Sequence, residues 1–536
     1  MDVACERSPS SSRLRRWVAW RIYLLPVMLV FAVTLPKINQ GEFRTDTGWY
    51  TAIALQAWRT GSFWTLYGEP GQPYFNKPPL AFWIHGALLH MLGPELWIAR
   101  VPTVVACVGC VVVTVGLSRL FAGRTMSLAI GCVLALSLDF VRRTHEVSLD
   151  MWQLLFMLLG MRAAVRGAIK GGVWRFAVGG AWIGLALMCK PLVALLVPLI
   201  VFAWLVVCEI RVGSTWVRTS IPRSREVIPR TKPDFGEDTN VGARGLGDIW
   251  LGPLVMVACA IAVAAPWHVS MMLLHGREFT AAYFGAEISA RVAGDFADTT
   301  STQSLPWFYL VRLARNHWPW LACIALAFVV LIRGRPLLRD GRGTWLAIMW
   351  SLAWFFAISV FADRRDRYAL PLFPGLAMVA GAWCARWSGV WLRRVQRRFA
   401  TWIPISAVVL CVGVSVIPFR MRAREDPSWT AMFEWLRDRG EPQVWQGAFM
   451  GDRGARLYLE FERWPITTRN RWGEFVVDRM HEPPAGALLM YHRRDGLAPG
   501  PNEDVVWTMR DLTVTRLISP PWSPIEVPDP GVWRGP

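Results

Sequence analysis

Apolar runs long enough to cross a lipid bilayer recur along this chain and constrain its fold more than any other feature. A helix needs about 20 apolar residues to cross the hydrocarbon core, and here 54% of the residues are hydrophobic and only 18% are charged. Transmembrane strands would alternate over about ten residues, and no such pattern is evident. We therefore expect an all-α polytopic membrane protein with about 11 transmembrane helices, at 17–36, 100–121, 125–141, 150–167, 175–189, 191–208, 249–271, 317–333, 343–361, 368–386 and 401–418.

The distribution of arginine predicts which side of the membrane each loop faces. The net charge is +19, and most Lys/Arg clusters lie between apolar runs, where the positive-inside rule places them. These clusters are cytoplasmic only if the shorter apolar stretch 78–93 lies along the outer face instead of crossing. We therefore expect a multi-pass inner (plasma) membrane protein with a cytoplasmic N-terminus. Its outer loop 37–99 would hold interfacial helices, and 209–248 would be a cytoplasmic linker.

The hydrophilic tail predicts a second domain on the extracytoplasmic side. We expect a transmembrane domain at 1–419 and a small α/β domain at 420–536. Apolar residues recur at helical spacing over Asp426–Arg439, which predicts a helix. Four strand-like stretches follow, at Gln443–Met450, Ala455–Phe461, Gly486–Tyr491 and Asp504–Thr515.

Composition also argues against two other kinds of site. A basic chain can bind nucleic acid, but here the positive charge follows the membrane topology, so we expect no nucleic-acid partner. Nine of the ten cysteines lie in or beside apolar runs without the clustering of a metal site, and we expect no structural disulfides. A zinc site needs three or four converging ligands, and no persuasive ligand spacing is found among His85, His90, His145, His268 and His275.

Charged side chains that the topology does not explain gather on the outer side. Asp46 follows the first span, Lys77 lies in a run that begins at Tyr74, and Asp150 stands at the mouth of a later span. The loop between the ninth and tenth spans carries Arg364, Arg365, Arg367 and Tyr368. Arginine and lysine bind phosphate, and a carboxylate can accept a proton from a hydroxyl. The pattern fits an anionic lipid headgroup as substrate, although solvated loop charges or headgroup anchors would produce it too.

Eight short motifs make the chain resemble a known group of membrane enzymes. They are Asp46–Tyr50, Tyr74–Leu80, Ala99–Pro102, Cys189–Pro191, Ala265–His268, His275–Phe279, Tyr283–Gly285 and Arg367–Pro374. With these motifs, the chain resembles the glycosyltransferases of the GT-C fold, in particular bacterial aminoarabinose lipid A transferases and their protein O-mannosyltransferase relatives. The motifs follow the family's order and cover most of residues 20–386. Only the run 74–79 is fairly specific by itself, so the order carries most of the weight.

The resemblance implies roles for five residues of this chain. It implies that Asp46, in the first outer loop, is the catalytic base, and that Asp150 is the second carboxylate of the site. Lys77 would contact the phosphate of the carrier. Tyr74 and Tyr368 would line the same cavity.

Three positions depart from the family's pattern. The first motif usually continues Asp-Glu-Gly-Arg-Tyr, whereas Thr47 and Trp49 replace the Glu and the Arg here. Loss of that arginine would shift phosphate contacts to the three arginines of the loop 364–367. Asn76 replaces a glutamate that is linked with a bound metal in the aminoarabinose enzymes. The sequence therefore predicts no certain cofactor and leaves the use of a divalent metal open.

The expected function is transfer of a sugar from a polyprenyl-phosphate carrier, with inversion, on the outer face of the membrane. The acceptor would be a lipid, a glycan or a protein. A transporter or flippase of lipid-linked sugars is the main alternative, although such proteins tend to contain inverted repeats and none is evident here. A catalytically dead scaffold with the same fold is a second alternative, which the three departures keep open.

Overall fold

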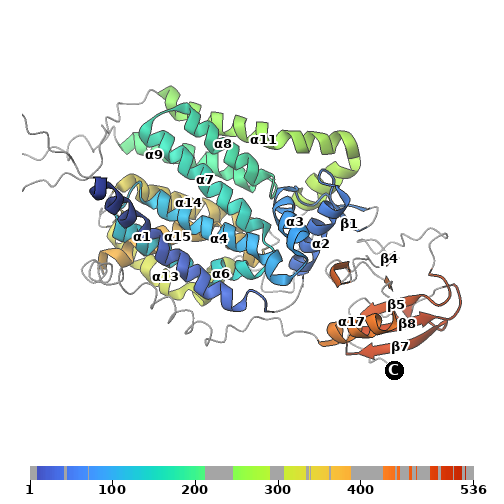
Figure 1. Ribbon diagram of the computed structural model, residues 1–536. Coiled ribbons are helices and arrows are strands. Elements are labelled where there is room, and N and C mark those ends of the chain that lie inside the picture. Colours follow the sequence, from blue (N-terminus) through green and yellow to red (C-terminus); the bar gives the residue numbers. More distant parts are fainter. Residues whose placement is uncertain are drawn as a thin grey trace, which may run out of the picture. The chain divides into compact units, whose positions relative to one another are not determined.

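The computed structural model (Figure 1) describes most of the apolar part of the chain and about half of the tail. The described residues are 9–40, 45–69, 72–211, 246–289, 307–332, 337–338, 340–360, 364–387, 427–440, 444–446, 458–460, 466–467, 483–492, 497–510, 512–521 and 525–526. They belong to two compact units. Unit 1 comprises Met1–Ile38, Phe75–Ala81 and Arg100–Ile417, and unit 2 comprises Asn39–Tyr74, Phe82–Ala99 and Pro418–Pro536.

Unit 1 is built almost entirely from apolar helices. Its main helices are α1 (Pro9–Thr34), α4 (Leu96–Ser118, which begins in unit 2), α5 (Arg124–Ala135), α6 (Leu138–Val141), α7 (Leu149–Lys170), α8 (Val173–Leu187), α9 (Leu196–Arg211), α11 (Leu246–Thr280), α13 (Phe308–Ile332), α14 (Gly341–Val360) and α15 (Leu372–Trp387). Short helical turns join some of them: η1 (Leu35–Lys37), η2 (Arg142–His145), η3 (Val193–Leu195), η5 (Ala281–Ser289) and η7 (Asp366–Ala369). Each predicted span before residue 400 coincides with helical structure, and the predicted span 401–418 lies outside the described residues.

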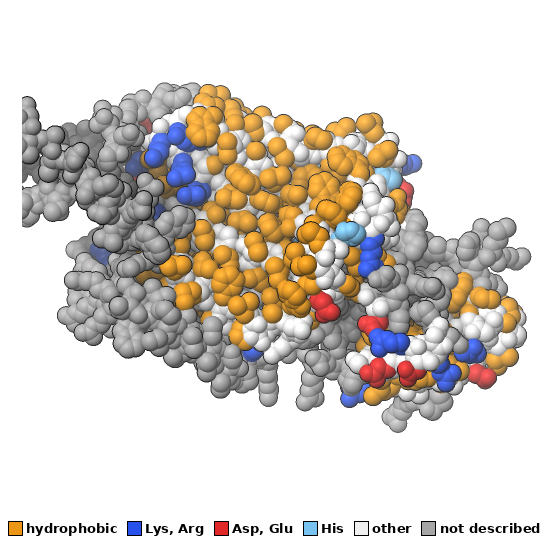
Figure 2. Space-filling model, viewed as in Figure 1, with side chains coloured by type: hydrophobic (Ala, Val, Ile, Leu, Met, Phe, Trp, Pro, Cys, Tyr) orange, Lys and Arg blue, Asp and Glu red, His pale blue; other side chains and the backbone are white. Residues whose placement is uncertain are grey.

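By length and composition, four of the described helices can each cross a membrane. They are Leu96–Ser118, Leu149–Lys170, Trp250–Gly285 and Gly341–Val360, and the bent pair Arg124–Ala135 with Leu138–His145 would make a fifth. The other predicted spans in the described part are shorter or interrupted apolar helices. Figure 2 shows hydrophobic side chains over most of the visible face of the helical bundle, as expected of a surface in contact with lipid.

The predicted span 125–141 is not one straight helix. Helix α5 ends at Ala135, and the next helical segment, Leu138–His145, turns away from it by 64°. Ser137 lies at the break, where its backbone is extended and its hydroxyl donates to the Val133 carbonyl at 2.8 Å. Serine hydroxyls compete in this way with the backbone ladder. The predicted span 125–141 is therefore formed by two helical segments that meet at a bend.

Glycines allow α8 and α11 to pack closely. A Cβ atom added at Gly180 would lie 2.3 Å from the Met256 carbonyl oxygen, and one at Gly184 would lie 2.5 Å from Val263 Cβ. Small residues spaced four apart are typical of tightly packed helices in membranes. The Gly180-to-Gly184 pair therefore brings the two backbones together along this interface.

Two helices and a short hairpin occupy the part of unit 2 that precedes residue 100. They are α2 (Thr45–Thr60), β1 (Tyr67–Glu69), β2 (Gln72–Pro73) and α3 (Leu80–Leu92), of which the first two residues of α3 belong to unit 1. A Cβ added at Gly86 would lie 2.3 Å from the Ala54 carbonyl oxygen, so α2 and α3 are in close contact. At 13 residues, α3 is about 20 Å long, too short to cross a hydrocarbon core of about 30 Å. Its interfacial position stays a prediction.

The tail contains a helix and a five-stranded mixed sheet. The elements are α17 (Pro427–Arg439), β3 (Trp445–Gln446), β4 (Ile466–Thr467), β5 (Leu488–His492), β6 (Leu497–Ala498), β7 (Glu503–Met509), β8 (Leu512–Leu517) and β9 (Ile525–Glu526). The sheet order is β4-β3-β5-β8-β7, with β3 parallel to β4 and β5 and the other pairs antiparallel. Trp429, Met432 and Leu436 of α17 pack against buried residues of β5 and β8.

Two of the strand predictions in the tail were wrong in detail. Asp504–Thr515 was expected to be one strand, but it contains parts of the two antiparallel strands β7 and β8. Arg510, between them, has a φ of 55°, in the left-handed region that turns use. In the predicted strand Ala455–Phe461, the described residues 458–460 are helical, because a short apolar run does not by itself distinguish helix from strand.

Candidate active site

Asp150 is held at the beginning of α7. Ser148 caps this helix, since its hydroxyl accepts a hydrogen bond from the Met151 amide at 3.3 Å, and the Ser148 amide donates to Thr103 Oγ1 at 3.0 Å. An acidic residue in the first turn is stabilised by the helix dipole. Lys190 Nζ lies 2.5 Å from Asp150 Oδ1, and both side chains are mostly buried. The sequence therefore folds this carboxylate into a fixed ion pair.

Lys190 links Asp150 to Tyr368. It lies in the turn between α8 and η3, where its carbonyl accepts a hydrogen bond from Gln153 Nε2 at 3.0 Å. Its ammonium lies 5.0 Å from the centre of the Tyr368 ring, within the range of a cation–π contact. Lys190 thus brings together two predicted site residues, Asp150 and Tyr368, although Lys190 itself was not predicted to belong to the site.

The predicted arginines occupy one short loop, which we call the η7 loop (residues 364–369). Tyr309 Oη donates to the Arg365 carbonyl at 3.3 Å, and the Tyr368 amide donates to the same carbonyl at 3.0 Å. Arg364 donates through Nη2 to the Ser359 carbonyl at 3.4 Å. Burial lowers the pKa of the Arg367 guanidinium, while attraction to Tyr368 and a hydrogen bond with it oppose that shift. The group stays positively charged at pH 7, because a free guanidinium titrates above about 12.

Lys77 lies in the segment Phe75–Ala81, which is fixed against helices of unit 1. The Leu80 amide donates to the Met188 carbonyl at 3.1 Å, two residues before Lys190. The Phe75 ring lies 4.9 Å from His275 and 5.6 Å from Phe279, centre to centre. Lys77 itself is only 4% exposed. Burying an unpaired ammonium is costly, so a lysine at this depth is held by its contacts in the fold.

Asp46 and Tyr74 belong to unit 2. Asp46 lies in the first turn of α2 and is half-buried. The Tyr74 amide donates to the Leu66 carbonyl at 2.7 Å, and its ring makes edge contacts with Trp49 and Phe82 at 6.2 and 5.8 Å. Trp49, at the position where the family has arginine, therefore supports the ring of Tyr74.

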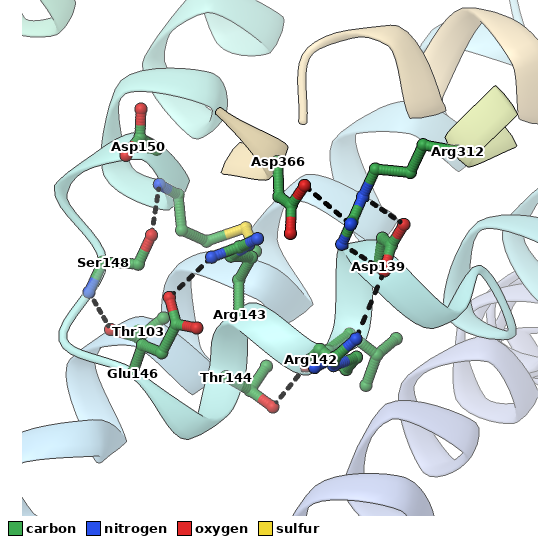
Figure 3. Close-up of polar contacts among 12 residues, drawn as sticks. Thr103, Asp139, Arg142, Arg143, Thr144, Glu146, Ser148, Asp150, Arg312 and Asp366 are labelled. Carbon is green, nitrogen blue, oxygen red and sulfur yellow. Dashed lines mark hydrogen bonds and ion pairs between the residues drawn. The ribbon is translucent and has the colours of Figure 1, made fainter. Parts of the chain in front are cut away.

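A second group of charges surrounds α6, and the sequence reasoning did not single out two of its members, Asp139 and Arg312. We call it the α6 charge cluster, and Figure 3 shows its labelled members with their ion pairs. Its members are Asp139, Arg142, Arg143, Glu146, Arg312 and Asp366. The available signal was Asp139, an acidic residue inside a predicted span, since such residues are rare and are commonly functional.

The described residues contain no group of three or more His, Cys, Asp or Glu side chains that could hold a metal ion. Asn76, where the family's metal-linked glutamate would stand, supplies only an amide oxygen and is half-buried. Within unit 1, the described candidate residues are the cations of Lys77, Lys190 and the η7 loop, the Asp150 carboxylate and Tyr368.

The sequence is similar to those of known transferases. The sequence model of the family described as dolichyl-phosphate-mannose-protein mannosyltransferase matches residues 76–224. An undecaprenyl phosphate-alpha-4-amino-4-deoxy-L-arabinose arabinosyl transferase of Pseudomonas fluorescens is 25% identical over 399 residues, which is 72% of this chain and 61% of that protein. A transferase of the same name from Photorhabdus laumondii is 20% identical over 77% of this chain and 68% of its own length.

Solved structures share the fold. ArnT from Cupriavidus metallidurans, bound to undecaprenyl phosphate, superposes with a TM-score of 0.66 at 16% identity, covering 93% of this chain and 98% of that one. The chain has the GT-C fold. An oligosaccharyltransferase of Archaeoglobus fulgidus gives a TM-score of 0.51 at 12% identity, over 85% of this chain and 65% of that one.

These findings confirm the resemblance to the superfamily of aminoarabinose transferases and protein mannosyltransferases. The chain aligns with only about 61% of the length of the Pseudomonas relative. The GT-C fold extends over nearly the whole chain. The activity of the longer relatives is therefore only proposed for this chain.

Proposed function

We propose that this GT-C protein is a glycosyltransferase that takes a sugar from a polyprenyl-phosphate carrier on the outer face of the membrane. The observation that carries the proposal is the Asp150–Lys190–Tyr368 arrangement, beside the arginines of the η7 loop, in a chain with this fold. A carboxylate with clustered cations suits a reaction that moves a proton and releases a phosphate. The structural relative from Cupriavidus is itself bound to undecaprenyl phosphate.

The reaction is a displacement at the anomeric carbon with inversion. The acceptor hydroxyl forms the new C–O bond while the bond between the anomeric carbon and the phosphate oxygen breaks. Asp46 takes the proton from the hydroxyl. Lys77 and the η7-loop residues Arg364, Arg365 and Arg367 hold the departing lipid phosphate and its growing negative charge.

The other site residues have supporting roles in the proposal. Tyr74 and Tyr368 line the cavity that receives the donor. Asp150 completes the site as a second carboxylate, fixed by Lys190. Sugar and acceptor stay open, and the acceptor is a membrane lipid, a glycan or a protein.

The proposed topology follows from the charge distribution. About 11 helices cross the inner membrane, the N-terminus is cytoplasmic, and the first outer loop carries α2 and α3 along the interface. Residues 1–419 form the catalytic domain, and 420–536 form an extracytoplasmic α/β domain. Under this arrangement Asp46, Lys77, Asp150 and the η7 loop all face the outer side.

Sugar release in detergent separates the proposal from its rivals. Purified wild-type protein is mixed with radiolabelled polyprenyl-phosphate sugars, and free or transferred sugar is measured. A transporter or flippase needs two compartments and gives no product in micelles, and an inactive scaffold gives none either. Turnover with any donor supports the enzyme. A folded protein that binds a carrier phosphate but never releases the sugar would overturn the proposal.

A further inference from the structure

Asp139 is a buried carboxylate that four side chains surround. It is 5% exposed and lies on α6. Its oxygens lie 2.9 Å from Asn316 Nδ2, 3.3 Å from His317 Nε2, 3.3 Å from Arg312 Nε and 3.6 Å from Arg142 Nη1. Three of these partners lie on one stretch of α13. A buried charge needs such partners, so Asp139 fixes the position of α13 beside α6.

Arg312 contacts two carboxylates at once. One edge of its guanidinium faces Asp139, and Nη1 on the other edge lies 2.6 Å from Asp366 Oδ1. Figure 3 shows Arg312 between the two acids. The planar guanidinium presents donors in fixed directions. The contact with Asp139 therefore sets the orientation of the Arg312 guanidinium, and in this orientation the guanidinium contacts Asp366.

Asp366 is the first residue of η7 and stands between Arg365 and Arg367. Its side chain is 39% exposed, and an ion pair this accessible contributes little to overall stability. The ion pair does connect the η7 loop to α13. Tyr309, one helical turn before Arg312 on α13, bonds to the same loop through the Arg365 carbonyl, so α13 holds the loop at two adjacent points.

We propose that Arg312 is a positioning residue: anchored by Asp139, it holds Asp366 and thereby sets the η7 loop in the geometry that binds the carrier phosphate. The inference rests on the proposed function, because that function makes the η7 arginines the phosphate ligands. The same contact fixes the place of Tyr368, whose ring lies over Lys190. Neither Arg312 nor Asp139 touches the substrate in this proposal.

Asp366→Asn tests the inference without disturbing the buried half of the network. It keeps the shape of the side chain but removes the charge that Arg312 holds. We expect KM for the polyprenyl-phosphate sugar to rise about tenfold while kcat changes less than about threefold, because phosphate binding is weakened in ground and transition states alike. Backbone amides of the η7 loop should exchange hydrogen at least about tenfold faster.

Glu146→Gln is the matched control, since Glu146 forms a comparable ion pair with Arg143 at 2.8 Å in the same cluster but does not belong to the η7 loop. It should leave KM and loop exchange as in the wild type. Arg312→Lys keeps the charge but lacks the fork that meets both carboxylates, and it should give an intermediate KM. An unchanged KM in Asp366→Asn, whether or not the loop exchanges faster, would overturn the inference. An equal rise in KM for Glu146→Gln would overturn it as well.

Failure of the proposed function would look different. If wild-type protein turns over no polyprenyl-phosphate sugar and binds no polyprenyl phosphate, the proposed function falls, and loop exchange in Asp366→Asn still reports whether Arg312 orders the loop. If the wild type is active and Asp366→Asn matches it in KM, only the positioning role of Arg312 falls.

Discussion

At the scale of single residues, the ion pair with Lys190 holds Asp150, which we propose as the second carboxylate of the site. Both side chains are mostly buried. Removing one partner of a buried pair strands the other charge, whereas removing both does not. The pair is therefore best tested by comparing single and double substitutions.

Lys190→Met should lower the free energy of unfolding by about 3 kcal/mol, because Asp150 is left without the ammonium that neutralises it. The double variant Lys190→Met/Asp150→Asn should recover at least about half of that loss. Denaturant titration in detergent micelles measures both values. The single variant Asp150→Asn is measured as well. If the loss in the double variant equals the sum of the losses in the two single variants, the 2.5 Å contact does not couple Asp150 and Lys190.

His85 gives a prediction about pH at the same scale. It is fully buried in α3, and burial lowers its pKa to about 4, although its hydrogen bond to the Ala99 carbonyl works in the opposite direction. The unfolded chain takes up the proton near pH 6.5 and the folded chain near 4. The free energy of unfolding therefore has its full value above about pH 6.5, and it falls by up to about 3 kcal/mol as the pH drops to 4.

His85→Gln should remove this part of the pH dependence. Thermal midpoints measured from pH 7.5 to pH 4 would then fall less steeply in the variant than in the wild type. His90, which lies on the same helix and is exposed, provides the control, since His90→Gln should leave the slope unchanged. Parallel curves for wild type and His85→Gln would contradict the prediction.

At the scale of elements, the interface of α8 and α11 depends on the absence of side chains at two glycines. Gly180→Ala should destabilise the protein by about 1–3 kcal/mol, because the new Cβ would lie 2.3 Å from a backbone oxygen of α11. Gly285→Ala is the matched control, since nothing lies within 4 Å of a Cβ added there. Equal thermal midpoints for Gly180→Ala and Gly285→Ala would contradict the prediction, because α8 and α11 would then accommodate the added methyl group without loss of stability.

The sequence predicted elements well where one physical signal dominated. The helix Asp426–Arg439 was confirmed as α17 because its apolar residues recur on one face, which packs against the sheet. The break at Ser137 and the turn at Arg510 were missed. Both are changes of direction inside apolar or strand-like runs, and a run of residue types does not record where the backbone turns.

Some residues of the proposed site stood out in the sequence for a related reason. Asp150, Tyr368 and the η7 arginines stood out as charged or aromatic residues where the topology required none. Lys190 joins Asp150 to Tyr368 across 40 and 178 sequence positions, and Arg312 joins Asp139 to Asp366. Pairings of this kind depend on how helices pack, so they became visible only in the folded chain.

At the scale of the whole molecule, the fold and the chemistry of the site support one account. The apolar surface seen in Figure 2 suits a protein embedded in lipid. The GT-C fold covers nearly the whole length of a solved relative bound to undecaprenyl phosphate. Under the proposed function, a lipid-borne donor would reach the site from within the membrane, where Lys77 is buried.

The central claim is sugar transfer with Asp46 as base, and the most direct test is turnover of polyprenyl-phosphate sugars by wild type and Asp46→Asn in nanodiscs. We predict that the variant binds the donor like the wild type but loses about 10²- to 10⁴-fold in turnover, the usual contribution of a general base. Glu95→Gln, an exposed outer-loop carboxylate without a proposed role, should retain full activity. Wild-type turnover in Asp46→Asn would contradict the account.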